Sequence, residues 1–194
     1  MNFAVLDQQA LEALVLDPPS VESEPLRCTD AFVAELIPSA SDPRSTQLRH
    51  VLVAAHELLV RIASRAMVGR TLLDKPALVK DYLKVLFAGA EHETFVVIFL
   101  DAQIRVIATE EMFRGTLTQT SVYPREVVKR AMQHNAACLI VSHCHPSGSC
   151  EPSRADEFLT QTLKSAVAIV DVRLMDHIVV GGSSCCSFAE RGLL

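Results

Sequence analysis

Near residue 94 the sequence changes to runs of β-branched and aromatic residues, and this change constrains the fold more than any other feature. Thr94 to Leu100 is a run of β-branched and aromatic residues, and residues 104–112 follow it after a short polar turn. The two segments together predict a β-hairpin. Residues 137–143 form a third apolar run, which predicts a buried strand leading into a loop rich in Pro, Ser and Gly. The chain beyond residue 94 is therefore expected to be built around a β-sheet.

Helical patterns lie before and between these strands. Apolar residues recur at helical spacing over residues 46–67, 76–87, 124–134 and 153–169. Further short strands are predicted over residues 116–121, 173–180 and 186–188, with a Gly181-Gly182 turn before the last. The helices and strands mix without strict βαβ alternation. This order predicts an α/β (α+β-like) fold in which helices flank a mixed sheet.

The first 45 residues differ from the rest of the chain. Short apolar runs at residues 10–16 and 31–37 are interrupted by several prolines and surrounded by serines and acidic residues. This pattern is typical of a variable, weakly packed arm with one or two short helices. We therefore divide the chain into an arm (1–45), a helical lead-in (46–90) and a main domain (91–194).

Composition excludes several classes of protein. At 194 residues, 49% hydrophobic and 21% charged, the chain is expected to form one globular domain. No apolar run approaches the ~18 residues of a membrane span, and the N-terminus lacks the basic region of a signal peptide, so we expect a cytoplasmic protein. The net charge of −5, without a dense basic cluster, argues mildly against DNA as the main ligand. The six cysteines include no C-x-x-C pair and are expected to be free thiols.

The chemistry of the chain is concentrated between residues 142 and 156. His143 and His145 stand two apart at the end of the predicted strand, so their side chains leave the same face and can converge on one ion. Asp156 lies one turn into the following helix and can close the site from the other side. Two imidazoles and one carboxylate suit Zn²⁺, and three protein ligands leave a position for water, as in catalytic zinc sites.

Each of these residues also has a simpler explanation. A lone His-x-His pair is more often two exposed histidines than a metal site. Ser153 and Asp156 form a Ser-x-x-Asp pattern, which is close to a capping box and explains both residues as a helix start. The combination of a histidine pair, a tight loop and a helix-initiating Ser and Asp favours the metal site. A capping role and a catalytic role for Ser153 are compatible.

The spacing of these residues resembles the JAMM signature of the JAB/MPN metallopeptidases: His-x-His, seven residues, Ser, two residues, Asp. The wider sequence, from about residue 50 onward, is most similar to the RadC family. The segments that carry this similarity are residues 113–117, 124–126, 143–148, 152–153, 176–177 and 187–192. The resemblance implies a JAB/MPN domain, which is a three-layer, cytidine deaminase-like sandwich.

The resemblance also implies residue roles. His143, His145 and Asp156 would hold Zn²⁺, and Ser153 would donate a hydrogen bond to the developing oxyanion. The signature calls for an upstream glutamate as general base, and Glu93, directly before the strand that begins at Thr94, fits best. Glu91 is the second choice.

The chain departs from the family pattern at two places. Cys144 stands between the two histidines where relatives commonly have Asn, and on an alternating strand it is expected to point away from the metal. No glycine precedes Gly69, so the first 50 residues cannot supply the glycine-containing helix-hairpin-helix DNA module that many relatives carry. The family's association with DNA repair is therefore a weak guide here.

A second polar pair, Asp176-His177, lies directly before an apolar strand run. It can be interpreted as a second metal site or an acid–base pair, but we favour a role in which the ring of His177 braces the core or the site.

The leading functional hypothesis is a zinc-dependent metallopeptidase or isopeptidase-like hydrolase acting on a peptide or protein substrate. The alternative is a metal-binding, non-proteolytic module that acts in DNA repair or recombination through partner proteins, and a scaffold without turnover is a third interpretation. The sequence determines neither the identity of the substrate nor the oligomeric state. The apolar composition of the chain is compatible with a dimer.

Overall fold

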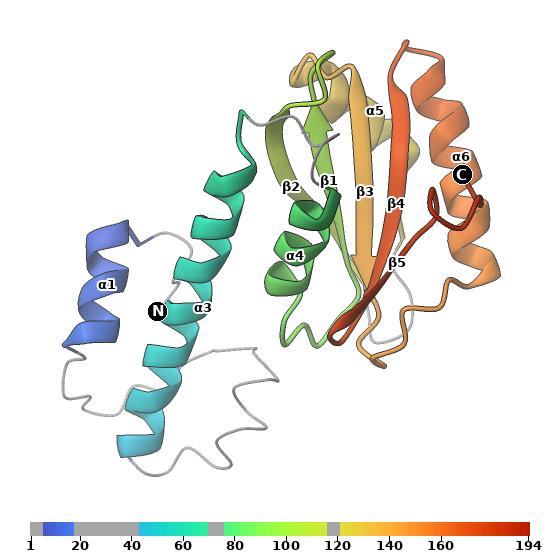
Figure 1. Ribbon diagram of the computed structural model, residues 1–194. Helices are drawn as coiled ribbons and strands as arrows, with labels where there is room; N and C mark the ends of the chain where they lie inside the picture. Colours follow the sequence, from blue (N-terminus) through green and yellow to red (C-terminus); the bar gives the residue numbers. More distant parts are fainter. Residues whose placement is uncertain (1–5, 18–42, 70–75, 116–120) are drawn as a thin grey trace.

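A five-stranded mixed sheet forms the centre of the computed structural model, which describes residues 6–17, 43–69, 76–115 and 121–194 (Figure 1). The strand order is β2-β1-β3-β4-β5. The strands are β1 (Thr94–Leu100), β2 (Val106–Arg114), β3 (Cys138–Cys144), β4 (Arg173–Gly181) and β5 (Ser184–Ser187). Neighbouring strands run antiparallel except β3 and β4, which are parallel and are joined through a helix.

Helices cover both faces of this sheet. The helices among the described residues are α1 (Gln8–Leu16), α3 (Pro43–Met67), α4 (Pro76–Leu86), α5 (Pro124–Gln133) and α6 (Arg154–Ala168). Helix α4 lies on one face, and α5 and α6 lie on the other (Figure 1). The arrangement is a three-layer α/β sandwich, so the predicted fold class is confirmed.

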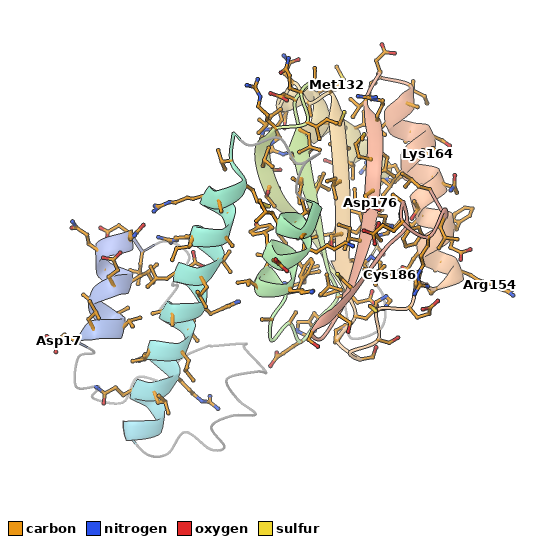
Figure 2. The ribbon with its side chains drawn as sticks, in the orientation of Figure 1. Asp17, Met132, Arg154, Lys164, Asp176 and Cys186 are labelled. Carbon is orange, nitrogen blue, oxygen red and sulfur yellow. The ribbon has the colours of Figure 1, made fainter. Side chains whose placement is uncertain are left out.

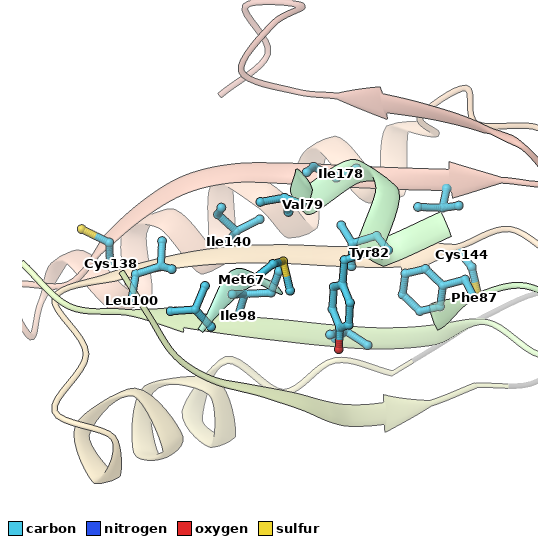
Figure 3. Packing of buried hydrophobic residues seen from close by; sticks show 14 residues of the cluster. Met67, Val79, Tyr82, Phe87, Ile98, Leu100, Cys138, Ile140, Cys144 and Ile178 are labelled. Carbon is cyan, nitrogen blue, oxygen red and sulfur yellow. The ribbon is translucent and has the colours of Figure 1, made fainter. Parts of the chain in front are cut away.

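Alternate residues of β1 pack on opposite faces of the sheet, and both faces of this strand are buried. Every residue of the strand is buried. Val96, Ile98 and Leu100 pack toward α4, together with Tyr82 and Leu83 of that helix (Figure 3). The residues between them, such as Phe95, Val97 and Phe99, pack toward α5 and α6. A strand buried on both faces reads as a continuous apolar run, which is the pattern seen in the sequence.

The parallel pair β3–β4 creates the place where a site can form. Helix α6 connects these two strands, so its N-terminus lies close to the carboxyl end of β3. Crevices outside the carboxyl ends of strands are common binding sites in sheets of this kind. Figure 2 shows Arg154, the first residue of α6, toward the opposite end of the sheet from Met132 of α5.

The N-terminal helices form a smaller cluster. Leu11 of α1 is fully buried against Val53 and Ala54 of α3. Helix α1 contains the predicted apolar run at residues 10–16, whereas the run at residues 31–37 lies outside the described residues. The division of the chain at residues 45 and 90 stays a prediction. Helix α4, which that division places in the lead-in, shares a hydrophobic core with the sheet.

The predicted elements agree with the structure apart from a few boundaries. Strand β2 begins two residues later than expected because the Asp101 side chain accepts hydrogen bonds from the backbone N–H groups of Gln103 and Arg105 and extends the turn. Strand β5 begins earlier than expected because Gly182, at φ +56°, closes a tight turn in which Gly181 pairs with Ser184. Most of the predicted strand at residues 116–121 lies outside the described residues.

Two further expectations concern membrane spans and cysteine thiols. Among the residues that the structure describes, no helix is long and apolar enough to cross a membrane. The five cysteines in the described part of the chain have free thiols.

Candidate metal centre

Three side chains converge where β3 ends and α6 begins. Nε2 of His143 lies 2.9 Å from Nε2 of His145 and 3.2 Å from Oδ1 of Asp156, and the second Asp156 oxygen lies 3.6 Å from Nε2 of His145. One ligand atom from each residue falls within a group no wider than 4.8 Å. Three mutually facing donor atoms, none separated by another side chain, fit a single metal ion. The structure therefore brings together the three predicted ligands.

The ligands differ in their access to solvent. The side chain of His143 is 5% exposed, whereas those of His145 and Asp156 are 15% and 14% exposed. The cluster is thus buried on the sheet side and reaches the surface on the other. Partial exposure of two of the three residues is typical of catalytic zinc sites, which keep a position for water or substrate, rather than of closed structural ones.

The electrostatics of the cluster favour a cation. Burial tends to raise the pKa of Asp156, but the hydrogen bonds and charges of His143 and His145 outweigh it and hold the pKa well below its usual range. The nearby Asp156 carboxylate in turn raises the pKa of His145. Asp156 is therefore an anion that faces two imidazoles, and a metal ion can replace the proton that these groups share.

The buried ring of His177 contacts His143 on the side opposite the candidate metal position. His143 Nδ1 lies 2.8 Å from His177 Nε2, and His177 Nδ1 lies 2.6 Å from the Thr160 hydroxyl. The His177 ring stacks on Phe188 with ring centroids 4.7 Å apart and meets Phe95 edge-on. Burial lowers the pKa of His177 to about 3, so this ring is neutral. The bracing interpretation of His177 agrees with these contacts.

Asp176 does not share the site with its neighbour. Its carboxylate accepts hydrogen bonds from the Ser187 hydroxyl and from the backbone N–H groups of His177 and Ala189. Burial raises the pKa of Asp176 despite these bonds. The side chain therefore ties β4 to the chain segment after β5, and the interpretation of Asp176-His177 as a second metal site finds no support in these contacts.

The loop after β3 holds His145. Its Nδ1 lies 2.8 Å from the Ser149 carbonyl oxygen, which can only accept, so Nδ1 carries a proton and Nε2 faces the site. Gly181 of β4 permits this arrangement, since a Cβ there would lie 2.3 Å from the Ser149 carbonyl carbon and 2.5 Å from the Cys150 nitrogen. The Ser149 carbonyl and Gly181 were not singled out from the sequence as parts of the site, because a backbone acceptor and a close backbone approach leave no motif.

Ser153 performs the capping role that its pattern predicted. It is the N-cap of α6, its Oγ accepts from the Asp156 backbone N–H, and the Asp156 side chain accepts from the Ser153 backbone N–H, which completes a capping box. The Ser153 hydroxyl also donates to Oδ2 of Asp156 at 2.6 Å. The hydroxyl proton therefore points at a metal ligand, and it must rotate before it can donate to an oxyanion.

Glu93 lies at the same end of the sheet as the ligands. Phe95 of β1 pairs with His143, and continuing this antiparallel register by two residues places Glu93 opposite His145. The charge of Glu93 contributes to the raised pKa of His145, which indicates that the two side chains are near each other. Glu93 as a whole residue is half-buried.

Glu91 lies on a different part of the surface. It lines a cavity of about 230 Å³ bordered by α3, α4 and the start of β1, which also contains Tyr82, Thr94 and Val96. Val96 packs on the α4 face of the sheet, whereas His143 lies on the other face. The cavity contains none of the three ligands, so the geometry favours Glu93 over Glu91 as a partner of the site.

Cys144 points away from the candidate metal centre. It belongs to the hydrophobic core on the α4 face, and its thiol donates a weak hydrogen bond to the His92 carbonyl oxygen at 3.4 Å. Burial raises the pKa of Cys144, so the group is a neutral thiol. The alternation expected for this strand is confirmed.

Comparisons with known proteins agree with this geometry. Residues 73–193 match the model of the family described as the RadC-like JAB domain. A UPF0758 protein of Leptothrix cholodnii is 59% identical over 146 residues, covering 75% of this chain and 66% of the relative. A UPF0758 protein of Nitrosomonas eutropha is 51% identical over 158 residues, which cover 81% of this chain and 69% of that relative.

A third relative aligns over more of the chain. The UPF0758 protein of Verminephrobacter eiseniae is 48% identical over 188 residues, covering 93% of this chain and 79% of the relative. For the Leptothrix protein and a relative from Variovorax paradoxus, the chain spans slightly less than two thirds of the length of the curated relative. The match to the family model nevertheless includes α4, the whole sheet and all three candidate ligands. This chain belongs to the RadC family and carries a RadC-like JAB domain.

Proposed function

We propose that this chain is a zinc-dependent hydrolase that cleaves an amide bond in a peptide or protein, with the ion held by His143, His145 and Asp156. The convergence of these three ligands at a surface-accessible strand end carries the proposal. Two imidazoles and a carboxylate with an open side are the donor set of catalytic zinc sites in hydrolases. When bound, Zn²⁺ lowers the pKa of a coordinated water and polarises a carbonyl group.

Glu93 is the group that handles the proton in this proposal. The register of β1 and β3, continued by two residues, sets Glu93 opposite His145, and this supports the assignment. The residue is half-buried, which is compatible with access to both solvent and site. A carboxylate there can accept a proton from the attacking water and deliver it to the leaving amine. Ser153 can donate to the developing oxyanion once its hydroxyl turns away from Asp156.

The test separates metal binding from turnover. Purified protein is analysed for zinc by mass spectrometry and assayed on fluorogenic peptide libraries, one with ordinary peptide bonds and one with isopeptide-linked lysines. We expect Glu93→Gln to keep one zinc per chain and to lose at least about 100-fold of the turnover, as removal of a general base does. Glu91→Gln is the matched control, because this acid lines the cavity on the α4 side. Undiminished hydrolysis by Glu93→Gln would contradict the assignment of the base.

The alternative is a metal-binding module that acts in DNA transactions without proteolysis. It predicts zinc binding with no hydrolysis of either library, and DNA binding that persists at physiological salt. The net charge of −5 gives no support to strong phosphate contacts. We therefore propose the hydrolase, and a titration with duplex DNA at physiological ionic strength tests the alternative directly.

A further inference from the structure

A circuit of three hydrogen bonds connects four residues behind the candidate metal position. The circuit runs from the His143 ring to the His177 ring, from there to the Thr160 hydroxyl, and from that hydroxyl to the Asp156 backbone carbonyl. On the side of the candidate metal position, Oδ1 of the Asp156 side chain lies 3.2 Å from Nε2 of His143. Residues from β3, β4 and α6 thus join two of the three ligands through groups that never touch the metal position.

The direction of each hydrogen bond in this circuit follows from a single fixed acceptor. The Asp156 carbonyl oxygen can only accept, and it lies 2.6 Å from Oγ1 of Thr160. The one hydroxyl proton of Thr160 is therefore used in that bond. Oγ1 must then accept from His177, whose Nδ1 lies 2.6 Å away, so Nδ1 of His177 carries the ring proton.

The proton position on His177 in turn determines the proton position on His143. The His177 ring is fully buried, so it is neutral, and a neutral imidazole with its proton on Nδ1 has a bare Nε2. Nε2 accepts from Nδ1 of His143 across 2.8 Å. His143 therefore carries a proton on Nδ1, and its remaining nitrogen, Nε2, is the atom that faces His145 and Asp156.

We propose that Thr160 and His177 are positioning residues that fix the tautomer and the ring orientation of His143 and thereby present its Nε2 lone pair to the metal. Both side chains are fully buried, and His177 is held between Phe188 and Phe95, so the ring cannot turn without disturbing the core. Outer partners of this kind commonly tune metal affinity by 10–100-fold. The inference uses the metal site of the proposed function but does not depend on turnover.

Helix α6 offers a matched control for Thr160. Thr162, two residues further on, is half-buried, and its hydroxyl donates to the Phe158 carbonyl oxygen at 2.8 Å. This is the same i to i−4 bond that Thr160 makes to Asp156. Thr→Val is nearly isosteric, so Thr160→Val and Thr162→Val remove the same hydroxyl and the same type of bond from one helix. Thr160 is fully buried and contacts His177, whereas Thr162 is half-buried and its hydroxyl bonds to Phe158.

The first measurement is zinc affinity, determined by competition with a chromogenic chelator. We expect Thr160→Val to bind zinc about 10–100-fold more weakly, while Thr162→Val binds like the wild type and Thr160→Ser, which keeps the hydroxyl, recovers most of the affinity. Wild-type affinity in Thr160→Val, or failure of Thr160→Ser to recover it, would overturn the proposal.

The second measurement needs no variant. Long-range ¹H–¹⁵N spectra of the histidine rings in the wild-type protein report which nitrogen of each imidazole carries the proton. The proposal requires His177 to be protonated on Nδ1 alone and His143 to carry a proton on Nδ1. A proton on Nε2 of His177 overturns it even if Thr160→Val fails to fold. Since neither measurement uses a substrate, absence of hydrolysis would count against the proposed function and leave this inference standing.

Discussion

The two faces of the central sheet differ, although the same strands build both. The face under α4 is apolar along its length, from Leu100 at one end to Cys144 at the other. The face under α5 and α6 begins with the same kind of packing, including Phe99 and Leu139, but ends in the polar cluster around His143 and His177. The difference arises within single strands, because neighbouring residues of β3 point to opposite faces.

This contrast shows how the fold separates stability from chemistry. Core packing on the α4 face contributes to the free energy of unfolding, and this cluster includes none of the three candidate ligands. The polar end of the other face holds three imidazoles and a carboxylate that must be fully hydrogen-bonded to be tolerated in partly buried positions. Substitutions on the two faces are therefore expected to produce different phenotypes, and the following predictions test this expectation.

The largest effect is expected at the polar end. Asp156→Ala removes one of three ligands and leaves two imidazoles facing each other, so zinc affinity should fall by more than the ~100-fold typical of losing an outer-shell partner. The stabilisation by zinc, measured as the rise in melting temperature on adding the metal, should disappear with it. Glu157→Ala is the control, because this neighbouring acid in the first turn of α6 is exposed and lies outside the ligand group. Equal losses in both variants would mean that the first turn, and not the ligand, matters.

The apolar face should respond in the opposite way. Ile98 is fully buried under α4, and Ile98→Ala should lower the free energy of unfolding by about 2–5 kcal/mol through lost burial and a cavity. Zinc content should remain that of the wild type in the folded fraction. Urea denaturation and mass spectrometry of the same sample check both statements, and loss of zinc without loss of stability would break the separation of the two faces.

The polar end should also make stability depend on pH. The pKa of His177 is lowered to about 3 in the folded protein, against an ordinary value near 6.5 in the unfolded chain. Below pH ~6.5 the unfolded state binds a proton that the folded state cannot, so stability falls as the pH falls toward 3, by up to about 1.4 kcal/mol per pH unit. With a chelator present to remove metal, His177→Phe should show a shallower fall than the wild type. Identical slopes would contradict this account.

A smaller effect is expected where the backbone supports the site. Gly181→Ala places a Cβ against the Ser149 carbonyl group, so the loop must move and the hydrogen bond to His145 is lost or weakened. We expect zinc affinity to fall by about 10-fold, as for other outer-shell partners. Gly182→Ala is the comparison, since it strains a turn at φ +56° without contacting the ligand loop closely. A larger loss of affinity in Gly182→Ala than in Gly181→Ala would contradict the role of the Ser149 carbonyl.

The sequence predicted the fold, and it predicted that the three candidate ligands would come together, for physical reasons. The strand runs are continuous in their apolar character because both faces are covered, and a His-x-His spacing at a strand end places both rings on one face. Thr160 was missed, although it stands one turn after Asp156 in the buried row that continues with Leu163 and Val167. A polar residue in an apolar helical row is a usable signal, but its partner, His177, lies on another strand and only the folded chain brings the two together.

The smallest effect is expected for Cys144, which lies between the two histidine ligands in sequence but on the opposite face. Its thiol packs in the α4 core and donates to the His92 carbonyl oxygen. Cys144→Ala removes one buried sulfur atom, so we expect a loss of about 1 kcal/mol or less in stability. We expect no change in zinc affinity, and no change in the absorption spectrum of protein in which Co²⁺ replaces Zn²⁺. A change in that spectrum would place a thiolate at the metal and overturn the alternation of β3 on which the comparison of the two faces depends. An unchanged spectrum would extend the separation of the faces down to adjacent residues.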